Sequence, residues 1–275
     1  MYKMIVSDLD ESLLRTDGSV SPRDIATIHR LKQEGVKFVP NTGRGFASVQ
    51  PLLQALGTAG EAGQYVISYN GGAIVDNAHN EILIAHALPF EVADQIYRMA
   101  MASGQFCAHV YTFHHVYIAN PNPDELAYMA NRGVAYEPLT AGDLSSLVGR
   151  PIAKVIFQNL DLAVRRTLRE QVEATIETPL NVTYSSNRYV EFNPATVDKG
   201  DAAIALGERI GIAPEEIIAL GDNANDLSML TKVGLGVSVA NGIPAVKAAA
   251  GLVLPVTNDE DPVTALYAAV FGPTE

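Results

Sequence analysis

Short apolar runs alternate with amphipathic stretches in the first part of this chain, and this alternation limits the possible folds more than any other feature. The first amphipathic stretch opens with Ser21 and Pro22, an N-cap followed by a Pro at the first helical position. Strands that alternate with helices form parallel sheets, because each crossover helix returns the chain to the same edge. The sequence therefore predicts an α/β fold with a Rossmann-like parallel-sheet core. The elements expected here are strands at 3–7, 36–41 and 65–68 and helices at 22–34 and 46–56.

From residue 83 to about 188 the order of elements changes, and strands follow one another without an intervening helix. After Lys199 the alternation returns. We therefore expect one domain built from residues 1–82 and 189–275, with an α+β domain inserted at 83–188. The later elements expected are helices at 90–103, 123–132, 162–177 and 199–210 and from 226, and strands at 106–111, 115–118, 153–157, 181–185, 189–192, 217–220 and 236–239.

Asp8 and Asp10 directly follow the first predicted strand. In an extended segment alternate side chains share a face, so both carboxylates can point into one crevice while Leu9 packs into the core. Open parallel sheets bind ligands at the carboxyl ends of their strands. One carboxylate could then attack a substrate while the other moves a proton. An Asp-x-Asp at the end of a strand is also common turn chemistry, and that alternative stays open at this point.

Three further polar segments lie at or beside predicted strand ends: Thr42-Gly43-Arg44, Asp198-Lys199-Gly200 and residues 221–226. Each has a structural alternative. Thr42 could cap a helix, Lys199 could be an exposed surface charge, and the last segment could be a turn into an acidic helix start. That last alternative explains Asp226 better than Asp222. It also leaves open why acids gather at two strand ends that face one crevice, since like charges held together need a cation.

The chemistry of these residues favours a metal and a phosphate. Carboxylates from Asp8 and Asp222, with a backbone carbonyl and waters, suit Mg²⁺, whereas zinc would require His or Cys ligands. Thr42 with the amides that follow it, and Lys199 with its ammonium, then form a cradle for a dianionic group. A phosphate is the simplest such group.

The composition of the chain limits the classes of partner that it can bind. The formal net charge is −12, which opposes nucleic acid or an anionic membrane surface as a partner. The single cysteine, Cys107, excludes an intrachain disulfide and a Cys-rich zinc site, and we expect it to be a core thiol. The sequence shows neither a transmembrane run nor a signal peptide. We therefore expect a cytoplasmic protein.

Four segments of the chain resemble, in their order, the motifs of the haloacid dehalogenase superfamily of aspartate-nucleophile phosphatases: residues 8–12, Thr42-Gly43-Arg44, Asp198-Lys199-Gly200 and residues 221–226. The resemblance is specifically to the Cof-type branch with a type IIB cap. The resemblance runs nearly end to end and includes residues 70–73, 191–194 and 236–241. It implies a Mg²⁺-dependent phosphatase that hydrolyses a small phosphorylated metabolite, such as a sugar phosphate or a phosphorylated cofactor, through an aspartyl-phosphate. It also implies that the inserted domain is the cap.

The resemblance implies roles for the acidic residues. Asp8 would be the nucleophile and a metal ligand. Asp10 would be the general acid and base, and its backbone carbonyl would also bind the metal. Asp222 would be a further Mg²⁺ ligand, and Asp226 would lie at the metal, binding it directly or through water.

The resemblance also implies the residues that hold the phosphate. Thr42, Gly43 and Lys199 would bind the transferring phosphoryl group, with Thr42 and Lys199 taking part in catalysis. Asn225 would lie near the metal and help to bind the substrate phosphate. The chain departs from the family pattern at three positions, none of which removes a catalytic group: Glu11 replaces a frequent Gly, Ser12 replaces the usual Thr, and Pro262 stands where a Gly is common.

Two other functions remain compatible with these residues. A phosphomutase would use the same aspartyl-phosphate, and a non-catalytic module would bind the phospholigand without turnover. In the inserted domain, His114, His115 and Arg132 could touch the leaving group of a substrate. Exposed or core-satisfied histidines are the structural alternative for the first two.

Overall fold

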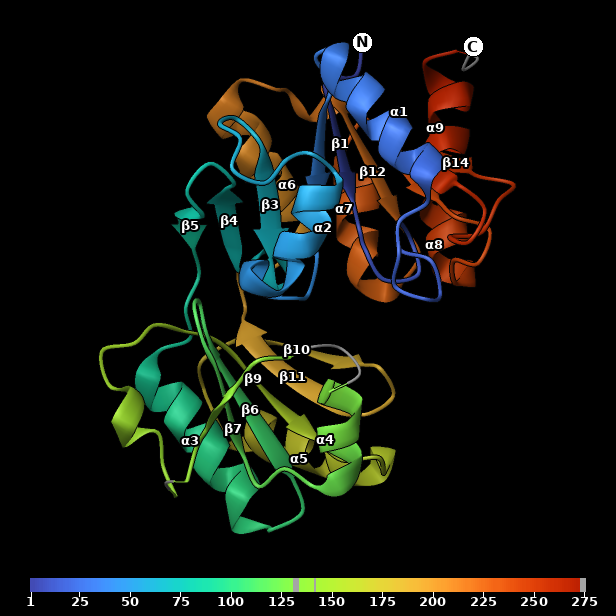
Figure 1. The fold of residues 1–275 in the computed structure, drawn as a ribbon. Helices are drawn as coiled ribbons and strands as arrows, with labels where there is room; N and C mark the ends of the chain where they lie inside the picture. The colour runs from blue at the N-terminus through green and yellow to red at the C-terminus, as the bar shows by residue number, and fades with distance from the viewer. Residues whose placement is uncertain (131–133, 141, 273–275) are drawn as a thin grey trace. The chain divides into compact units, whose positions relative to one another are not determined.

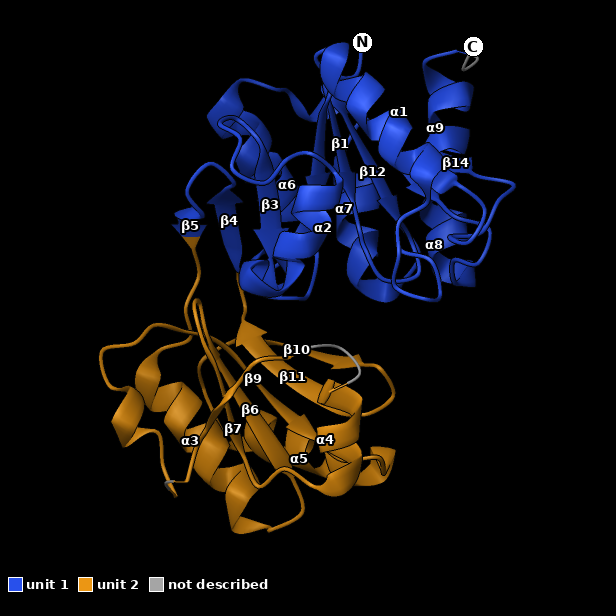
Figure 2. Cartoon of the chain, in the orientation of Figure 1, with its two compact units in different colours: residues 1–84, 198–275 blue, residues 85–197 orange. Residues whose placement is uncertain are grey.

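The computed structural model describes residues 1–130, 134–140 and 142–272, and the chain forms two compact units (Figures 1 and 2). Unit 1 consists of Met1–Ile84 and Asp198–Glu275, and unit 2 is Ala85–Val197. The expected fold class is confirmed, but the second boundary falls after residue 197 rather than after 188. The physical reason is that β11 (Tyr189–Pro194) pairs with β9 (Ile152–Gln158) and β10 (Leu180–Ser185), so it belongs to the sheet of unit 2.

A five-stranded parallel sheet forms the core of unit 1, in the order β14-β13-β12-β1-β2. β1 lies between β12 and β2, and all four of its residues are buried. The chain therefore leaves β1 at the carboxyl edge of the sheet between two neighbouring strands, and parallel sheets place their ligands at this edge. The strands are β1 (Met4–Ser7), β2 (Lys37–Pro40), β12 (Ile217–Gly221), β13 (Leu235–Ser238) and β14 (Leu252–Val253).

Two helices of unit 1 begin as their sequences predict. The Ser21 side chain accepts a hydrogen bond from the amide of Asp24 (3.0 Å) at the start of α1 (Pro22–Gln33). The Asp198 side chain accepts one from the amide of Asp201 (2.8 Å) at the start of α6 (Lys199–Ile210). The expected helix at 46–56 divides into a 3₁₀ turn and α2. The remaining helical elements of unit 1 are η1 (Phe46–Val49), α2 (Gln50–Ala55), η4 (Pro214–Glu216), η5 (Ala224–Asp226), α7 (Leu227–Lys232), α8 (Pro244–Ala249) and α9 (Pro262–Val270).

The third predicted strand, β3 (Tyr65–Ser68), is present, but it does not simply extend the parallel sheet. It pairs antiparallel with β4 (Ala73–Asp76) and forms a separate three-stranded sheet with β4 and β5 (Glu81–Ala85). A single parallel bridge, Asn41↔Ile67, connects it to the end of β2. The tight turn between β3 and β4, 3₁₀ turn η2 (Tyr69–Gly71), makes this antiparallel pairing possible.

Unit 2 is built on a six-stranded sheet in the order β10-β11-β9-β6-β7-β8. Alternate strand residues such as Val110, Phe157 and Phe192 point into one apolar core, which they share with residues of α3 and α5. The elements not yet given are α3 (Phe90–Ala102), β6 (Cys107–Thr112), β7 (Val116–Ala119), α4 (Pro123–Ala130), β8 (Glu137–Pro138), η3 (Ser145–Leu147) and α5 (Leu162–Thr175).

Two buried ion pairs lie within unit 2. Arg188 donates to Glu125 of α4 through Nη2 (2.8 Å), and Lys154 of β9 donates to Glu191 of β11 (2.6 Å). At least 90% of each of these four side chains is buried. Two carboxylates face two cations among these four side chains, and we call the four residues the balanced cluster. Arg188 also pairs with the exposed Asp124, and His109 lies 3.2 Å from Glu125 (Nε2 to Oε1). Burial alone would raise the pKa of both Glu125 and Glu191. Hydrogen bonds from His109, Tyr189 and Arg188 lower the pKa of Glu125, and the charge of Lys154 with its hydrogen bond lowers that of Glu191.

Other sequence expectations for the inserted region have mixed outcomes. Cys107 is a buried free thiol, as expected, and burial raises its pKa to about 12. His115 is exposed and lies 2.8 Å from Glu137 (Nδ1 to Oε1), and His114 is also exposed. Arg132 lies outside the described residues. Over the part of the chain that the structure describes, no helix combines the length and apolar character needed to cross a bilayer.

Candidate active site

Asp8 stands immediately after β1, at the carboxyl edge of the parallel sheet. Its amide donates to the carbonyl of Leu220 at the end of β12 (2.9 Å), which fixes the backbone at this point. The carboxylate of Asp8 is buried, and the side chain of Leu9 packs into the core, as the alternation of an extended segment predicts. The fold therefore holds a carboxylate at the place where such sheets bind ligands.

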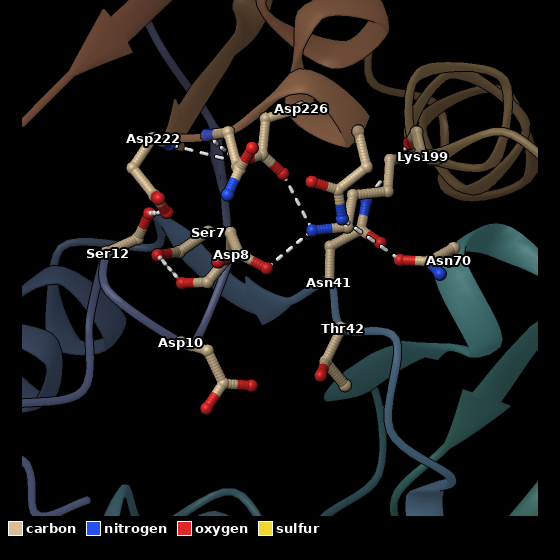
Figure 3. Close-up of polar contacts among 12 residues, drawn as sticks. Ser7, Asp8, Asp10, Ser12, Asn41, Thr42, Asn70, Lys199, Asp222 and Asp226 are labelled. Atoms are coloured by element: carbon tan, nitrogen blue, oxygen red, sulfur yellow. Dashed lines mark hydrogen bonds and ion pairs between the residues drawn. The ribbon is translucent and has the colours of Figure 1, made fainter. Parts of the chain in front are cut away.

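Lys199 brings a positive charge to this carboxylate. It is the first residue of α6, and its side chain is fully buried. The ammonium donates to Asp8 Oδ1 (2.5 Å) and to Asp226 Oδ1 (2.7 Å) (Figure 3). Burial alone would lower the pKa of Lys199, but Asp226 and Asp8 outweigh that effect and raise it above its ordinary value. The lysine is therefore a permanent cation at this site.

Asp222 and Asp226 lie in the loop that follows β12. The Oδ2 atom of Asp226 accepts hydrogen bonds from the amides of Asp222 and Asn223, both at 3.0 Å. The Oδ1 atom of Asp222 accepts one from the hydroxyl of Ser12 (2.7 Å). Asp226 thus uses one oxygen to hold Lys199 and the other to shape the loop that carries Asp222.

Negative charge exceeds positive charge in this group. Asp8, Asp222 and Asp226, which we call the acidic cluster, each offer a carboxylate oxygen, and these oxygens lie within 4.8 Å of one another. Burial raises the pKa of Asp222 to about 6, and it raises the pKa of Asp8 well above its ordinary value despite the contact with Lys199. One ammonium does not compensate three buried carboxylates. An oxygen-only set with excess negative charge fits Mg²⁺ and does not fit zinc.

Thr42 follows β2 and begins a turn that is held by several hydrogen bonds. Its amide donates to the carbonyl of Ile67 (2.9 Å), its hydroxyl accepts from the amide of Arg44 (3.1 Å), and its carbonyl accepts from the amide of Asn70 (2.9 Å). A Cβ atom on Gly43 would lie 3.2 Å from the Asn70 amide group, so a side chain there would crowd Asn70. The turn places Thr42 on the same edge as Asp8 (Figure 3).

Asn70 also lies at this edge, in the left-handed backbone conformation that Asn adopts more readily than most other residues. Its φ is 58°, and that of Gly71 is 103°. A Cβ atom on Gly71 would lie 2.4 Å from the carbonyl oxygen of Asp198, so only glycine lets the turn approach the start of α6. Asn70 accepts a hydrogen bond from the side chain of Asn225 (3.2 Å). Asn225 is exposed, and its side chain donates to Asn70 rather than to a member of the acidic cluster.

Asp10 is more exposed than Asp8, and its side chain points away from the Asp8 carboxylate in Figure 3. It forms a two-point ion pair with Arg44, in which Nε lies 3.1 Å from Oδ2 and Nη2 contacts Oδ1. The next residue, Glu11, has φ of 63°, in the left-handed region that favours glycine. This explains why glycine is common at that position in the family that the sequence resembles.

The structure brings Asp8, Asp222, Asp226 and Lys199 into direct contact or close range, with Thr42 on the same edge. Three residues in this region were not assigned a role from the sequence. Ser12 and Asn70 stand inside motifs that the sequence shows, and Arg44 completes the Thr42-Gly43-Arg44 segment. Their positions inside these motifs could therefore have identified them from the sequence, although their hydrogen bonds depend on the fold.

Comparisons with known proteins identify the family of this chain. A family model for haloacid dehalogenase-like hydrolases matches residues 5–266. The Bacillus subtilis protein YxeH is 29% identical over 99% of this chain and 100% of that protein. An HMP-PP phosphatase from Serratia proteamaculans is 26% identical over 90% of this chain and 87% of that protein. A solved haloacid dehalogenase-like hydrolase from Bacteroides thetaiotaomicron has a TM-score of 0.88 at 29% identity, covering 98% of this chain and 100% of the other.

The family model includes the segments that carry Asp8, Thr42, Lys199 and Asp222, and it extends across both units. This confirms the resemblance that the four segments indicated. Because the match covers nearly the whole chain, the protein belongs to the haloacid dehalogenase-like hydrolase family.

Proposed function

We propose that this protein is a Mg²⁺-dependent phosphatase that hydrolyses a small phosphorylated metabolite through an aspartyl-phosphate on Asp8. The observation that carries the proposal is the acidic cluster, in which three buried carboxylates lie within 4.8 Å of one another around one ammonium. Such a site lacks positive charge. A divalent cation would supply that charge, and a phosphate ester could then bind beside the cation. Family membership and the phosphatase name of a relative support the same reaction.

In the first step, an oxygen of the Asp8 carboxylate attacks phosphorus and the bond from phosphorus to the leaving alkoxide breaks. Asp10 gives its proton to that alkoxide. Water then attacks the aspartyl-phosphate, Asp10 takes a proton from it, and inorganic phosphate leaves. Lys199 neutralises charge on the phosphoryl oxygens, and Thr42 with the amide of Gly43 orients them.

The residues present fit a bound Mg²⁺, with Asp8, Asp222 and the backbone carbonyl of Asp10 as its protein ligands. When bound, Mg²⁺ supplies positive charge beside the phosphoryl group and the Asp8 carboxylate. We assign Asp226 a different main task, because its two oxygens already bind Lys199 and the loop amides. It would hold the lysine and reach the metal through water. Asn225, bonded to Asn70, would line the phosphate side of the site.

We further propose that unit 2 is the cap that selects the substrate, in the manner of the type IIB cap that the sequence resembles. The substrate class we favour is a sugar phosphate or a phosphorylated cofactor. A cytoplasmic location suits such metabolites, and a buried free cysteine is compatible with a reducing compartment. The proposals for the cap, the substrate class and the location rest on the family resemblance and on the chemistry of such metabolites.

The test is release of inorganic phosphate from sugar phosphates, pyridoxal phosphate, FMN and p-nitrophenyl phosphate, with Mg²⁺ and with EDTA. We expect Mg²⁺-dependent release, and we expect Asp8→Asn to lose almost all of it, because an amide is a poor nucleophile and a weaker metal ligand. The same substitution removes one of three crowded carboxylates, so the metal-free variant should unfold no more easily than the parent protein.

Measurable turnover by a correctly folded Asp8→Asn variant would refute the aspartyl-phosphate mechanism. Phosphate transfer between sugar positions without net release would instead identify a phosphomutase. Binding of phosphate esters without turnover of any substrate would identify a non-catalytic module.

A further inference from the structure

We infer that Asn241 is a positioning residue for the loop after β1, where it holds Glu11 in the left-handed conformation that sets the direction of the Asp10 carbonyl. The inference rests on the proposed function, because it takes that carbonyl as a Mg²⁺ ligand. The sequence places Asn241 in a segment that resembles the family, but it gives the residue no task. Its hydrogen bond to the loop supplies one.

Glu11 has a backbone conformation that a residue with a side chain rarely adopts. Its φ is 63°, and the left-handed region brings Cβ close to the following carbonyl oxygen, a conflict that glycine lacks. The torsions at the Glu11 Cα relate the two peptide units on either side of it, and the first of these units carries the carbonyl of Asp10. If Glu11 returned to a negative φ, that carbonyl would change direction relative to the rest of the loop.

The backbone hydrogen bonds of the loop hold its end to its beginning. Three amides donate to the carbonyl of Leu9, at 3.3, 3.1 and 2.7 Å: those of Ser12, Leu13 and Leu14. None of these three bonds involves the carbonyl of Glu11. That carbonyl instead accepts from Nδ2 of Asn241 (2.7 Å), which lies 230 positions further along the chain. Asn241 therefore fixes the peptide unit that follows Glu11.

The orientation of the Asn241 amide group is itself fixed. Its Oδ1 atom accepts from the backbone amide of Asn258 (3.0 Å). A backbone amide can only donate and a carbonyl can only accept, so this contact leaves Nδ2 for the carbonyl of Glu11. Asn258 is buried, and its own Nδ2 donates to the carbonyl of Leu14 (2.9 Å). The two asparagines therefore hold the loop at Glu11 and at Leu14.

A second asparagine makes the same pair of bonds elsewhere and provides a matched control. Nδ2 of Asn159 donates to the carbonyl of Gln105 (2.9 Å), and its Oδ1 accepts from the amide of Asp161 (2.8 Å). All three residues belong to unit 2, and none of them has a role in the proposed reaction. The stability lost with such a pair of bonds can therefore be measured apart from any effect on metal binding.

The experiment measures metal binding directly, by calorimetric titration of the metal-free protein with Mg²⁺ alone. Partners that orient a metal ligand contribute about 10- to 100-fold to metal affinity, so we expect Asn241→Leu to weaken Mg²⁺ binding by about 10-fold. Asn159→Leu should leave the affinity unchanged. With p-nitrophenyl phosphate, Asn241→Leu should also need about 10-fold more Mg²⁺ for half-maximal turnover.

Substitutions of Glu11 identify the cause of that loss. Glycine adopts positive φ about as readily as negative φ, so in a Glu11→Gly background Asn241→Leu should weaken Mg²⁺ binding by no more than about twofold. Glu11→Gln removes the charge of the side chain and keeps its Cβ atom. In that background the loss should remain about 10-fold, because the left-handed conformation still needs its partner.

Asp222→Asn separates this inference from the proposed function, because it removes a carboxylate that we assign to the metal. If it leaves Mg²⁺ binding unchanged, the proposed metal site fails, and the inference fails with it. If Asp222→Asn weakens binding but Asn241→Leu does not, the positioning role of Asn241 alone is overturned. The same conclusion holds if Asn241→Leu causes an equal loss in the Glu11→Gly and Glu11→Gln backgrounds.

Discussion

Each unit of this protein buries a cluster of charged side chains, and the two clusters differ in their balance of charge. In unit 2, the carboxylates of Glu125 and Glu191 face Arg188 and Lys154, and the pKa of each carboxylate is lowered. In unit 1, three carboxylates face Lys199 alone, and the pKa of Asp8 and that of Asp222 are raised. Burial raises the pKa in both places, so the difference comes from the neighbours of each carboxylate. Hydrogen bonds and positive charge surround Glu125 and Glu191, whereas other carboxylates add to the effect of burial at Asp8 and Asp222.

The comparison distinguishes two uses of buried charge. A cluster whose charges cancel needs no further partner, and it can fix how elements pack, as Arg188 does by joining α4 to the chain before β11. A cluster with excess negative charge leaves part of that charge uncompensated. The fold must then hold the carboxylates together against their mutual repulsion. Excess charge of one sign, rather than burial of charge as such, therefore marks the candidate active site.

The largest effect that would test this comparison is expected for Lys199→Met. Removing the ammonium that contacts Asp8 and Asp226 should lower kcat by about 10³-fold or more, because charge on the phosphoryl oxygens then lacks this partner in the transition state. Steady-state kinetics with p-nitrophenyl phosphate would measure it. A variant that keeps its kcat and changes only KM would show that Lys199 serves binding alone.

Loss of a cation from the balanced cluster should lower the stability of the protein. Arg188→Met leaves Glu125 buried without its guanidinium partner, and we expect the free energy of unfolding to fall by about 3–5 kcal/mol. Amide exchange in β9 and β11 would locate the loss in unit 2. The double variant Arg188→Met/Glu125→Gln should recover part of it, because the uncompensated charge is gone. A double variant no more stable than Arg188→Met would argue against charge compensation.

The pH dependence of stability should have opposite signs in the two units of the metal-free protein. The pKa of Asp222 is about 6 when folded and 3.8 in the unfolded chain, so the folded state holds its proton longer. Its contribution to stability is complete below pH 3.8 and is lost as the pH rises through about 6, on the order of 2–3 kcal/mol. Glu125 and Glu191 behave oppositely, because their stabilisation is present above pH 4.5 and is lost as the pH falls through their lower folded pKa.

Chemical unfolding between about pH 3 and 7, with EDTA and with Mg²⁺, measures this difference, because the loss at Glu125 and Glu191 falls below pH 4.5 and that at Asp222 above it. With EDTA, unit 1 should lose stability as the pH rises. With Mg²⁺ the loss should disappear, because the ion binds the ionised carboxylates. Asp222→Asn should flatten the slope in EDTA. Metal-free unit 1 that instead gains stability from pH 5 to 7 would show that the excess charge is relieved by some other means.

Much of this fold follows from local features of the sequence. The N-cap residues Ser21 and Asp198 mark where α1 and α6 begin, and the structure starts both helices there. The rule that parallel strands end at one edge brings Asp8 and Asp222 together from positions far apart in the chain. Local periodicity and one topological rule were therefore enough to predict the centre of the candidate site.

Other features depend on pairings that no local pattern contains. β11 belongs to unit 2 because of its antiparallel partners, whereas its sequence alone fits either unit. The hairpin of β3 and β4 depends on three successive residues with positive φ, from Tyr69 to Gly71. The ion pair of Arg44 with Asp10 joins residues 34 positions apart. A charged residue such as Glu125 is normally expected at the surface, so its burial could not be foreseen.

The division of unit 1 into two stretches of chain has a consequence for synthesis on the ribosome. Unit 2 is continuous, from Ala85 to Val197, and domains generally fold as units while the chain emerges. β1 is made early, but its partner β12 follows only after all of unit 2. Asp8 is therefore synthesised well before Asp222, Asp226 and Lys199, which all belong to the second stretch of unit 1. The acidic cluster is assembled only late in synthesis, so a chain stopped before Lys199 carries Asp8 but none of the residues that surround its carboxylate from the second stretch.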